Sequence, residues 1–165
     1  MTKNEERSLK LPDEYLTEIG RVCYQWSILE FTFNLWLIKL VDLDFNSPRS
    51  QAVFAHMTFP VKLDLFAALV NDLKSDFPML SDYKKILEML RKSQKDRNEV
   101  IHALWGMSDA GTHATMMRLT ARGAIKSTSN DITLDDLKKI APAINQTILE
   151  LHRFVVIGSG ATPAI

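Results

Sequence analysis

The chain has 165 residues, 46% of them hydrophobic and 24% charged, and its 20 basic residues are balanced by 20 acidic ones. This length and composition predict one globular domain with a sizeable core. A formal net charge of zero excludes a protein that coats nucleic acid through a large excess of lysine and arginine, although it is compatible with a local basic patch. The single cysteine, Cys23, excludes an internal disulfide framework and is typical of a reducing compartment.

The first ten residues, MTKNEERSLK, are polar and charged, so we expect no signal peptide there. The most apolar stretch, residues 15–41, is interrupted by Glu18, Arg21, Gln25, Glu30, Asn34 and Lys39. Such a pattern is typical of a half-buried helix rather than a membrane span. We therefore expect a cytoplasmic protein that does not bind a membrane. Its one domain is predicted at 12–157, between flexible tails at 1–11 and 158–165.

Apolar residues recur at spacings of three and four along four segments, which predicts four long amphipathic helices. The four long helices are predicted at 12–42, after Pro60 with an apolar face from Val61 to Leu73, at 81–104 and at 134–156. A short helix is predicted between the first two, from Pro48 to about Met57. Ser47 and Thr58 stand where N-caps are expected, each followed by a proline suited to the first helical turn.

Between the last two long helices, Gly106 and Gly111 interrupt the helical pattern. The segment around 105–127 is predicted to form a small β-hairpin or an irregular arm. Thr133, with Asp136 three residues on, approximates a capping box for the last helix. The expected fold is therefore all-α, a helical bundle of four long helices and one short helix, with this arm between the last two long helices.

One charged residue falls on the apolar stripe of the 81–104 segment. At about 100° per residue, Arg97 lies in the arc that Ile86, Leu90 and Leu104 define. Asn98 and His102, four residues apart, share one edge of this arc, so Arg97 and His102 lie about 140° apart and flank Asn98. A guanidinium cannot lose its charge on burial, so it needs an acceptor or a solvated cleft.

A misplaced carboxylate on the first helix offers such an acceptor. Glu30 lies among the apolar residues of that helix, and an unpaired buried carboxylate costs several kcal/mol. One interpretation is that Glu30 faces Arg97 or Asn98 across the bundle and orients the polar cluster. The other is that both charged side chains extend to solvent at the rim of the bundle.

The stretch RNEVIH, residues 97–102, fits the R-x4-H pattern, with Asn in second place, that marks HEPN domains (higher eukaryotes and prokaryotes nucleotide-binding). As in that family, it lies late in the third long helix of a predicted α-bundle, after KKILEMLRKSQKD, and it is followed by ALWG, a turn and a last helix. The first helix, with YQWSILEFTFNLWL, also resembles those of bacterial HEPN-like proteins. The resemblance covers most of residues 12–157.

This resemblance implies a ribonuclease that needs no metal or cofactor. Members are commonly homodimers in which two Arg/His sets line one cleft, and many act as toxins with an antitoxin partner or in antiphage defence. It implies that Arg97 and His102 are catalytic and that Asn98 supports them. Some family toxins carry a tyrosine three residues after the histidine as a target of nucleotide modification. Trp105 stands at that place here, so the resemblance does not carry that modification over.

The residue types suit this chemistry on their own terms. The 2′-hydroxyl of RNA can attack the adjacent phosphorus if one group takes its proton and a cation stabilises the phosphorane. An imidazole such as His102 exchanges a proton near neutral pH, and an arginine such as Arg97 presents a planar fork to phosphate oxygens. The products would be a 2′,3′-cyclic phosphate and a 5′-hydroxyl, and DNA would not be cut. Candidate RNA phosphate contacts on the same helix are Arg91, Lys92 and Lys95, with Lys84 and Lys85 nearby, although such a run is more often a solvated face.

Two other interpretations use the same residues. Glu99 and His102 match the Glu-x-x-His spacing of di-iron bundles, but no second copy exists, so we predict no metal site. His56, His113 and His152 are expected at the surface or at the edge of the bundle. Alternatively, the chain is a catalytically silent HEPN-like dimerisation or nucleotide-binding module. In that case any aromatic surface left outside the core serves partner binding. The aromatic residues concerned are Trp26, Phe31, Phe33, Trp36, Phe54 and Phe66.

Overall fold

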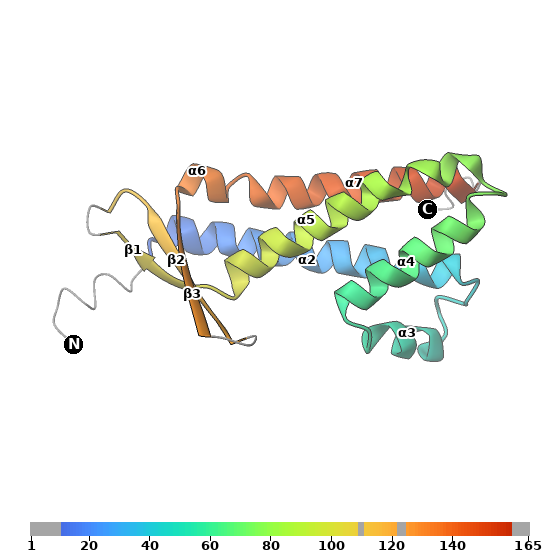
Figure 1. Cartoon of the computed structure of the whole chain (residues 1–165), viewed down its shortest axis with the longest axis horizontal. Coiled ribbons are helices and arrows are strands. Elements are labelled where there is room, and N and C mark those ends of the chain that lie inside the picture. The colour runs from blue at the N-terminus through green and yellow to red at the C-terminus, as the bar shows by residue number, and fades with distance from the viewer. Residues whose placement is uncertain (1–10, 109–110, 122–124, 160–165) are drawn as a thin grey trace. The chain divides into compact units, whose positions relative to one another are not determined.

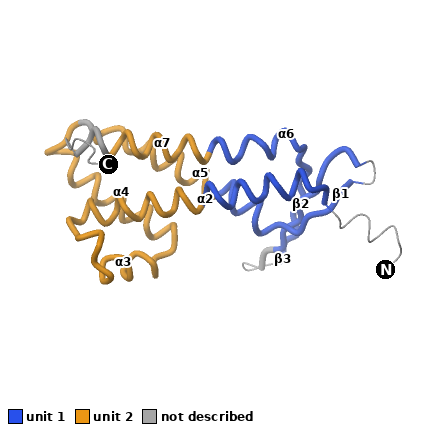
Figure 2. The backbone as a smooth tube through the Cα atoms, turned by 180° about the vertical axis from the view of Figure 1, so that it is seen from behind, with its two compact units in different colours: residues 1–26, 95–143 blue, residues 27–94, 144–165 orange. Residues whose placement is uncertain are grey.

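The structure, a computed structural model, describes residues 11–108, 111–121 and 125–159, most of which are helical (Figure 1). The predicted tails therefore lie almost entirely outside the described residues. The chain divides into two compact units: unit 1 comprises residues 1–26 and 95–143, and unit 2 comprises 27–94 and 144–165 (Figure 2). Among the described residues, no single helix is long and apolar enough to cross a membrane, although one sharply bent pair of consecutive helices meets that length and composition.

Helix α2 (Asp13–Leu40) confirms the first predicted helix. Acidic residues in its first turn and Lys39 in its last turn complement the helix dipole. It ends in a Schellman-type arrangement, since the Asp42 N–H donates to the Lys39 carbonyl and the Leu43 N–H to the Ile38 carbonyl, both at 3.1 Å. Asp42 takes the left-handed conformation, with φ 54°, where glycine is usual.

Two further predicted helices are confirmed as α3 (Pro48–Ala55) and α4 (Phe59–Leu73). Ser47 and Thr58 occupy the N-cap positions in extended conformation with proline just inside, as the sequence predicts. Neither side chain makes a capping hydrogen bond. The extended backbone of the cap residue and the fixed φ of proline thus define these two helix starts.

Aromatic side chains form the centre of unit 2. The Phe33 ring of α2 lies 5.3 Å from that of Phe59 and 5.5 Å from that of Phe66, both on α4. Phe66 also contacts Phe154 of α7 (Ile140–Ser159), at 6.2 Å between ring centroids. Phe33 and Phe66 are fully buried, so this stack joins three helices that are distant in the sequence.

Helix α5 (Tyr83–Ile101) follows a 3-10 turn, η1 (Pro78–Asp82), and ends before the predicted residue 104. Leu104 is 61% exposed and begins a strand, so its predicted place on the buried helical stripe is wrong. A short apolar run such as Leu104–Met107 suits a strand as well as a helix, and here it pairs with a second strand. Within unit 2, a buried hydrogen bond of 3.0 Å joins Ser93 of α5 to Thr147 of α7.

The predicted arm is a three-stranded antiparallel sheet in unit 1, larger than the hairpin that the sequence suggested. Its strands are β1 (Leu104–Met107), β2 (Ala114–Ala121) and β3 (Ile125–Ile132), in the order β1-β2-β3. Ala114 and Met116 of the central strand are buried, whereas Leu119 is 79% exposed. One face of β2 therefore packs on the core, as the two-residue period of a strand requires.

The last predicted helix is divided into α6 (Leu134–Leu137) and α7, so the single helix predicted at 134–156 is wrong at its start. Pro142 explains the break. Its ring would clash with the carbonyl of residue 138 in a continuous helix, but it is tolerated in the first turn of α7.

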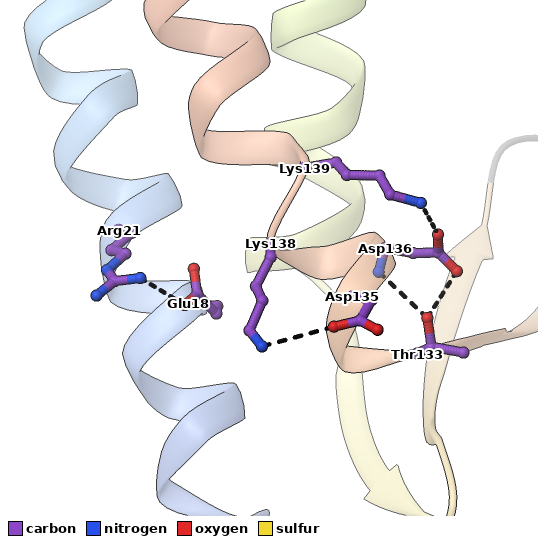
Figure 3. A network of polar contacts seen from close by, with 7 residues as sticks. All are labelled: Glu18, Arg21, Thr133, Asp135, Asp136, Lys138 and Lys139. Atoms are coloured by element: carbon purple, nitrogen blue, oxygen red, sulfur yellow. Dashed lines mark hydrogen bonds and ion pairs between the residues drawn. The ribbon is translucent and has the colours of Figure 1, made fainter.

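The predicted cap at Thr133 is confirmed (Figure 3). The backbone N–H of Asp136 donates to Thr133 Oγ1 at 3.1 Å, and the hydroxyl donates to Asp136 Oδ2 at 2.7 Å. The carboxylate of Asp136 also accepts from Lys139 Nζ at 2.6 Å. The hydrogen bonds from Lys139 and then Thr133 lower the pKa of Asp136 below its usual value, because both favour the charged carboxylate.

Candidate active site

The last turn of α5 positions the RNEVIH residues in unit 1. Arg97 and Asn98 lie inside the helix, and His102 follows its last residue, Ile101. The backbone N–H of His102 still donates to the Asn98 carbonyl at 3.2 Å, so helical geometry extends to the histidine. Arg97 and Asn98 are half-buried, and His102 is exposed.

The three motif side chains form one hydrogen-bonded cluster. Arg97 Nη1 donates to Asn98 Oδ1 at 2.9 Å and lies 3.2 Å from His102 Nε2. The helical wheel placed Arg97 and His102 about 140° apart on the two sides of Asn98. The arginine side chain is long enough to reach around the helix to His102, so the two side chains are closer than their positions on the wheel suggest.

The contact between Arg97 and His102 requires a particular state of the imidazole. Arginine has no acceptor, so Nη1 can hydrogen-bond to Nε2 of His102 only when Nε2 carries no proton. In this arrangement the proton of a neutral imidazole resides on Nδ1. Protonation of His102 on both nitrogens would break the contact and place two positive charges side by side.

Trp26 of α2 also contacts the guanidinium of Arg97. The guanidinium carbon of Arg97 lies 5.6 Å from the centre of the Trp26 ring, within the range of a cation–π interaction. Trp26 is 6% exposed, and Arg97 Nε is buried without a hydrogen-bond partner among the described residues. The charged group is thus partly desolvated and fixed in place, rather than extended into bulk solvent.

A second tryptophan secures the end of the motif helix. Trp105 Nε1 donates to the carbonyl of Val100 at 2.9 Å, which satisfies a carbonyl in the last turn of α5. Trp105 pairs with Met116 in the sheet, so this hydrogen bond links the motif helix to β1. The sequence pattern did not indicate either tryptophan contact, because a tryptophan on an apolar face is ordinarily part of the core.

The predicted partnership of Glu30 with Arg97 or Asn98 is corrected by the structure. Glu30 lies in unit 2, and its Oε1 is 3.2 Å from Nζ of Lys62 on α4. Lys62 is only 2% exposed, so its ammonium needs this carboxylate. The helical pattern of α4 gave no sign that a lysine on it is buried, and Arg97 instead contacts Asn98, His102 and Trp26.

The candidate phosphate contacts, Arg91, Lys92 and Lys95, are all exposed on α5. Lys95 Nζ lies 3.8 Å from Glu99 Oε1, a loose ion pair that an anionic ligand can displace. Their role in binding RNA stays a prediction.

The remaining histidines lie at the surface or half-buried. His56 and His152 are exposed, and His113 Nε2 of unit 1 lies 3.4 Å from Asp131 Oδ2. Within the part of the chain that the structure describes, no three His, Cys, Asp or Glu side chains come together as metal ligands would. No protein-family model, curated protein or solved structure matches the chain, so the residues and their geometry alone support a functional interpretation.

Proposed function

We propose that this protein is a metal-independent endoribonuclease of the HEPN type, with a HEPN-like helical bundle as its fold. The observation that carries the proposal is the cluster of Arg97, Asn98 and His102, in which a partly buried guanidinium lies 3.2 Å from an exposed imidazole. A fixed cation beside a group that exchanges protons is what cleavage of RNA by its own 2′-hydroxyl needs.

In the proposed reaction, an RNA phosphate displaces His102 from the guanidinium of Arg97. Arginine then holds the non-bridging oxygens of the phosphate, and Nε2 of His102 is free to accept the 2′-hydroxyl proton. The 2′-oxygen bonds to phosphorus and the bond to the 5′-oxygen breaks. The leaving 5′-oxygen takes a proton from His102 of the partner subunit in a homodimer, and this second imidazole must be doubly protonated and released from its own Arg97 to donate it. Asn98 keeps Arg97 aligned through the hydrogen bond at 2.9 Å.

The proposal also includes RNA contacts outside the cluster, a homodimeric state and a biological role. Lys95, exposed on α5 in unit 1, holds a phosphate that flanks the cleaved bond, and the exposed Arg91 and Lys92 of unit 2 stay candidate phosphate contacts from the sequence. A cytoplasmic homodimer of this kind acts as a toxin or in antiphage defence, and an antitoxin or another protein regulator restrains it.

The test measures cleavage of RNA by the wild type and by Arg97→Ala and His102→Ala in the presence of a chelator. Each variant is expected to lose roughly 10²- to 10⁴-fold in rate. Arg153→Ala and His56→Ala are matched controls, since both residues are exposed in unit 2, and they should retain activity. The products should carry a 2′,3′-cyclic phosphate and a 5′-hydroxyl, and an RNA with one 2′-deoxy sugar at the cleaved bond should resist. Cleavage that survives in both motif variants would refute the proposal.

One observation favours a second function, a catalytically silent nucleotide-binding or dimerisation module. The lone pair of Nε2, which a general base must offer, is occupied by Arg97 in this structure. RNA cleavage by the pure, dimeric wild type and nucleotide binding by Arg97→Ala distinguish the two functions. The silent module predicts that the wild type cleaves no RNA and that Arg97→Ala loses nucleotide binding. That result would favour the silent module.

A further inference from the structure

Unit 2 contains an open hollow of about 540 Å³, lined by residues from α2, the turn after it, and α7. Its volume lies in the range of small-molecule binding sites. The side chains that bear chemistry there are Trp36, Lys39, Asp42, Phe45 and His152. None of these residues belongs to the cluster of Arg97, Asn98 and His102, which lies in unit 1.

Aromatic rings make up much of the wall. The rings of Trp36 and His152 lie 5.6 Å apart at 57°, and both side chains are partly or largely exposed. Phe45 is 38% exposed and meets Phe31 edge-on at 6.4 Å. Exposed rings at a concave surface offer stacking area to a planar ligand.

Two opposite charges complete the lining. Lys39 Nζ lies 5.1 Å from the centre of the Trp36 ring. Asp42, three residues after Lys39 in the sequence, also lines the hollow. Among the described residues, neither Lys39 nor Asp42 forms an ion pair with another side chain. Asp42 also holds a left-handed backbone conformation, with φ 54°, at the rim of the hollow.

We propose that this hollow binds a nucleotide. The base stacks on the rings of Trp36 and Phe45, and the ammonium of Lys39 holds the phosphate. Asp42 accepts hydrogen bonds from ribose hydroxyls or from an amino group of the base. The neighbouring hollow of about 220 Å³ shares Lys39 with this one, but the rest of its lining is apolar and includes no acceptor such as Asp42. The shared chemistry is a base with its phosphate, from a free mononucleotide or from single-stranded RNA.

The experiment titrates the full-length chain carrying His102→Ala, which should not cleave RNA, with AMP, UMP and a uridine pentamer by isothermal calorimetry. The three variants are Trp36→Leu, Lys39→Met and Asp42→Asn. Trp36→Leu is expected to weaken binding roughly tenfold, since loss of one stacked base costs about that much. Lys39→Met should weaken binding and reduce its salt dependence. Because Lys39 is exposed, this variant is expected to fold even if Trp36→Leu does not.

Two controls place the ligand. Lys74→Met removes another exposed lysine of unit 2 and should leave affinity unchanged. Any binding that Arg97→Ala removes is assigned to the candidate active site, so the inference rests only on the binding that Lys39→Met and Trp36→Leu remove. Equal affinity for UMP and the pentamer indicates a free nucleotide as ligand, and binding of the pentamer alone indicates a strand. No binding at millimolar ligand, or binding lost in Arg97→Ala but kept in Lys39→Met, would overturn the inference.

Discussion

The ion pair between Glu30 and Lys62 joins a buried ammonium to a partly exposed carboxylate, and its contribution to stability can be measured directly. At 3.2 Å between Nζ and Oε1, two unit charges attract by about 5 kcal/mol at an effective dielectric constant of about 20. The Glu30 side chain is 38% exposed, so solvent screening reduces this to about 2 kcal/mol. We expect Glu30→Gln to lower the free energy of unfolding by about 2 kcal/mol, because it leaves the nearly buried ammonium without a charged partner.

The partner variant separates this pair from any other role of Glu30. Lys62→Met removes the buried charge at similar volume and should stay within about 1 kcal/mol of the wild type. In the Lys62→Met background, Glu30→Gln should cost less than about 0.5 kcal/mol. Urea unfolding at pH 7, followed by circular dichroism and by tryptophan fluorescence, measures all four proteins. If Glu30→Gln costs the same in both backgrounds, Lys62 is not its partner and the argument fails.

Three further predictions concern other parts of the chain. Trp26→Leu should reduce RNA cleavage in single-turnover assays about tenfold more than Trp26→Phe, because a phenyl ring keeps a face for the Arg97 guanidinium; equal losses would contradict this. Asp42→Gly should raise the free energy of unfolding by about 1 kcal/mol in urea, since glycine adopts φ 54° without strain, whereas Asp42→Ala should not. The lowered pKa of Asp136 means that its pairing stabilises the fold above the ordinary aspartate pKa and is lost as the pH falls through the folded-state pKa. An NMR titration of this carboxyl should show a midpoint below about 3.9, and Thr133→Val should raise it.

Local signals predicted most of the helices. The spacing of apolar residues located α2 and α4, and the proline that follows Ser47 located the start of α3. The Thr133 cap was also predicted, because an N-cap depends on residues three apart in the chain. Most of these features have a cause that lies within one turn of helix, which is why they can be read from sequence.

Features that depend on pairing between distant segments were missed or only partly predicted. The strand that begins at Leu104 forms because it pairs with β2, where Leu104 lies opposite Met117. The sequence of the preceding helix gives no signal of this pairing. The break before α7 had a local cause in Pro142, but the apolar period outweighed it in the prediction.

The candidate site shows the same division. The gathering of Arg97, Asn98 and His102 follows from their spacing on one helix end. The contact of Arg97 with Trp26, by contrast, joins residues 71 positions apart, and a helical wheel carries no information on such distances. The same limit explains why the sequence did not indicate Lys62 as the partner of Glu30, since the choice among cations on other helices depends on packing.

The edge strand β3 has a consequence for the behaviour of the protein at high concentration. β3 reads IKSTSNDI, and all of its residues before Ile132 are exposed. An open strand edge rich in valine or isoleucine recruits other chains into cross-β aggregates, whereas hydroxyl, amide and lysine side chains discourage this. Replacing Ser127 and Ser129 with valine would remove that protection, so the polar composition of β3 is a safeguard against fibril growth rather than a mark of a weak strand.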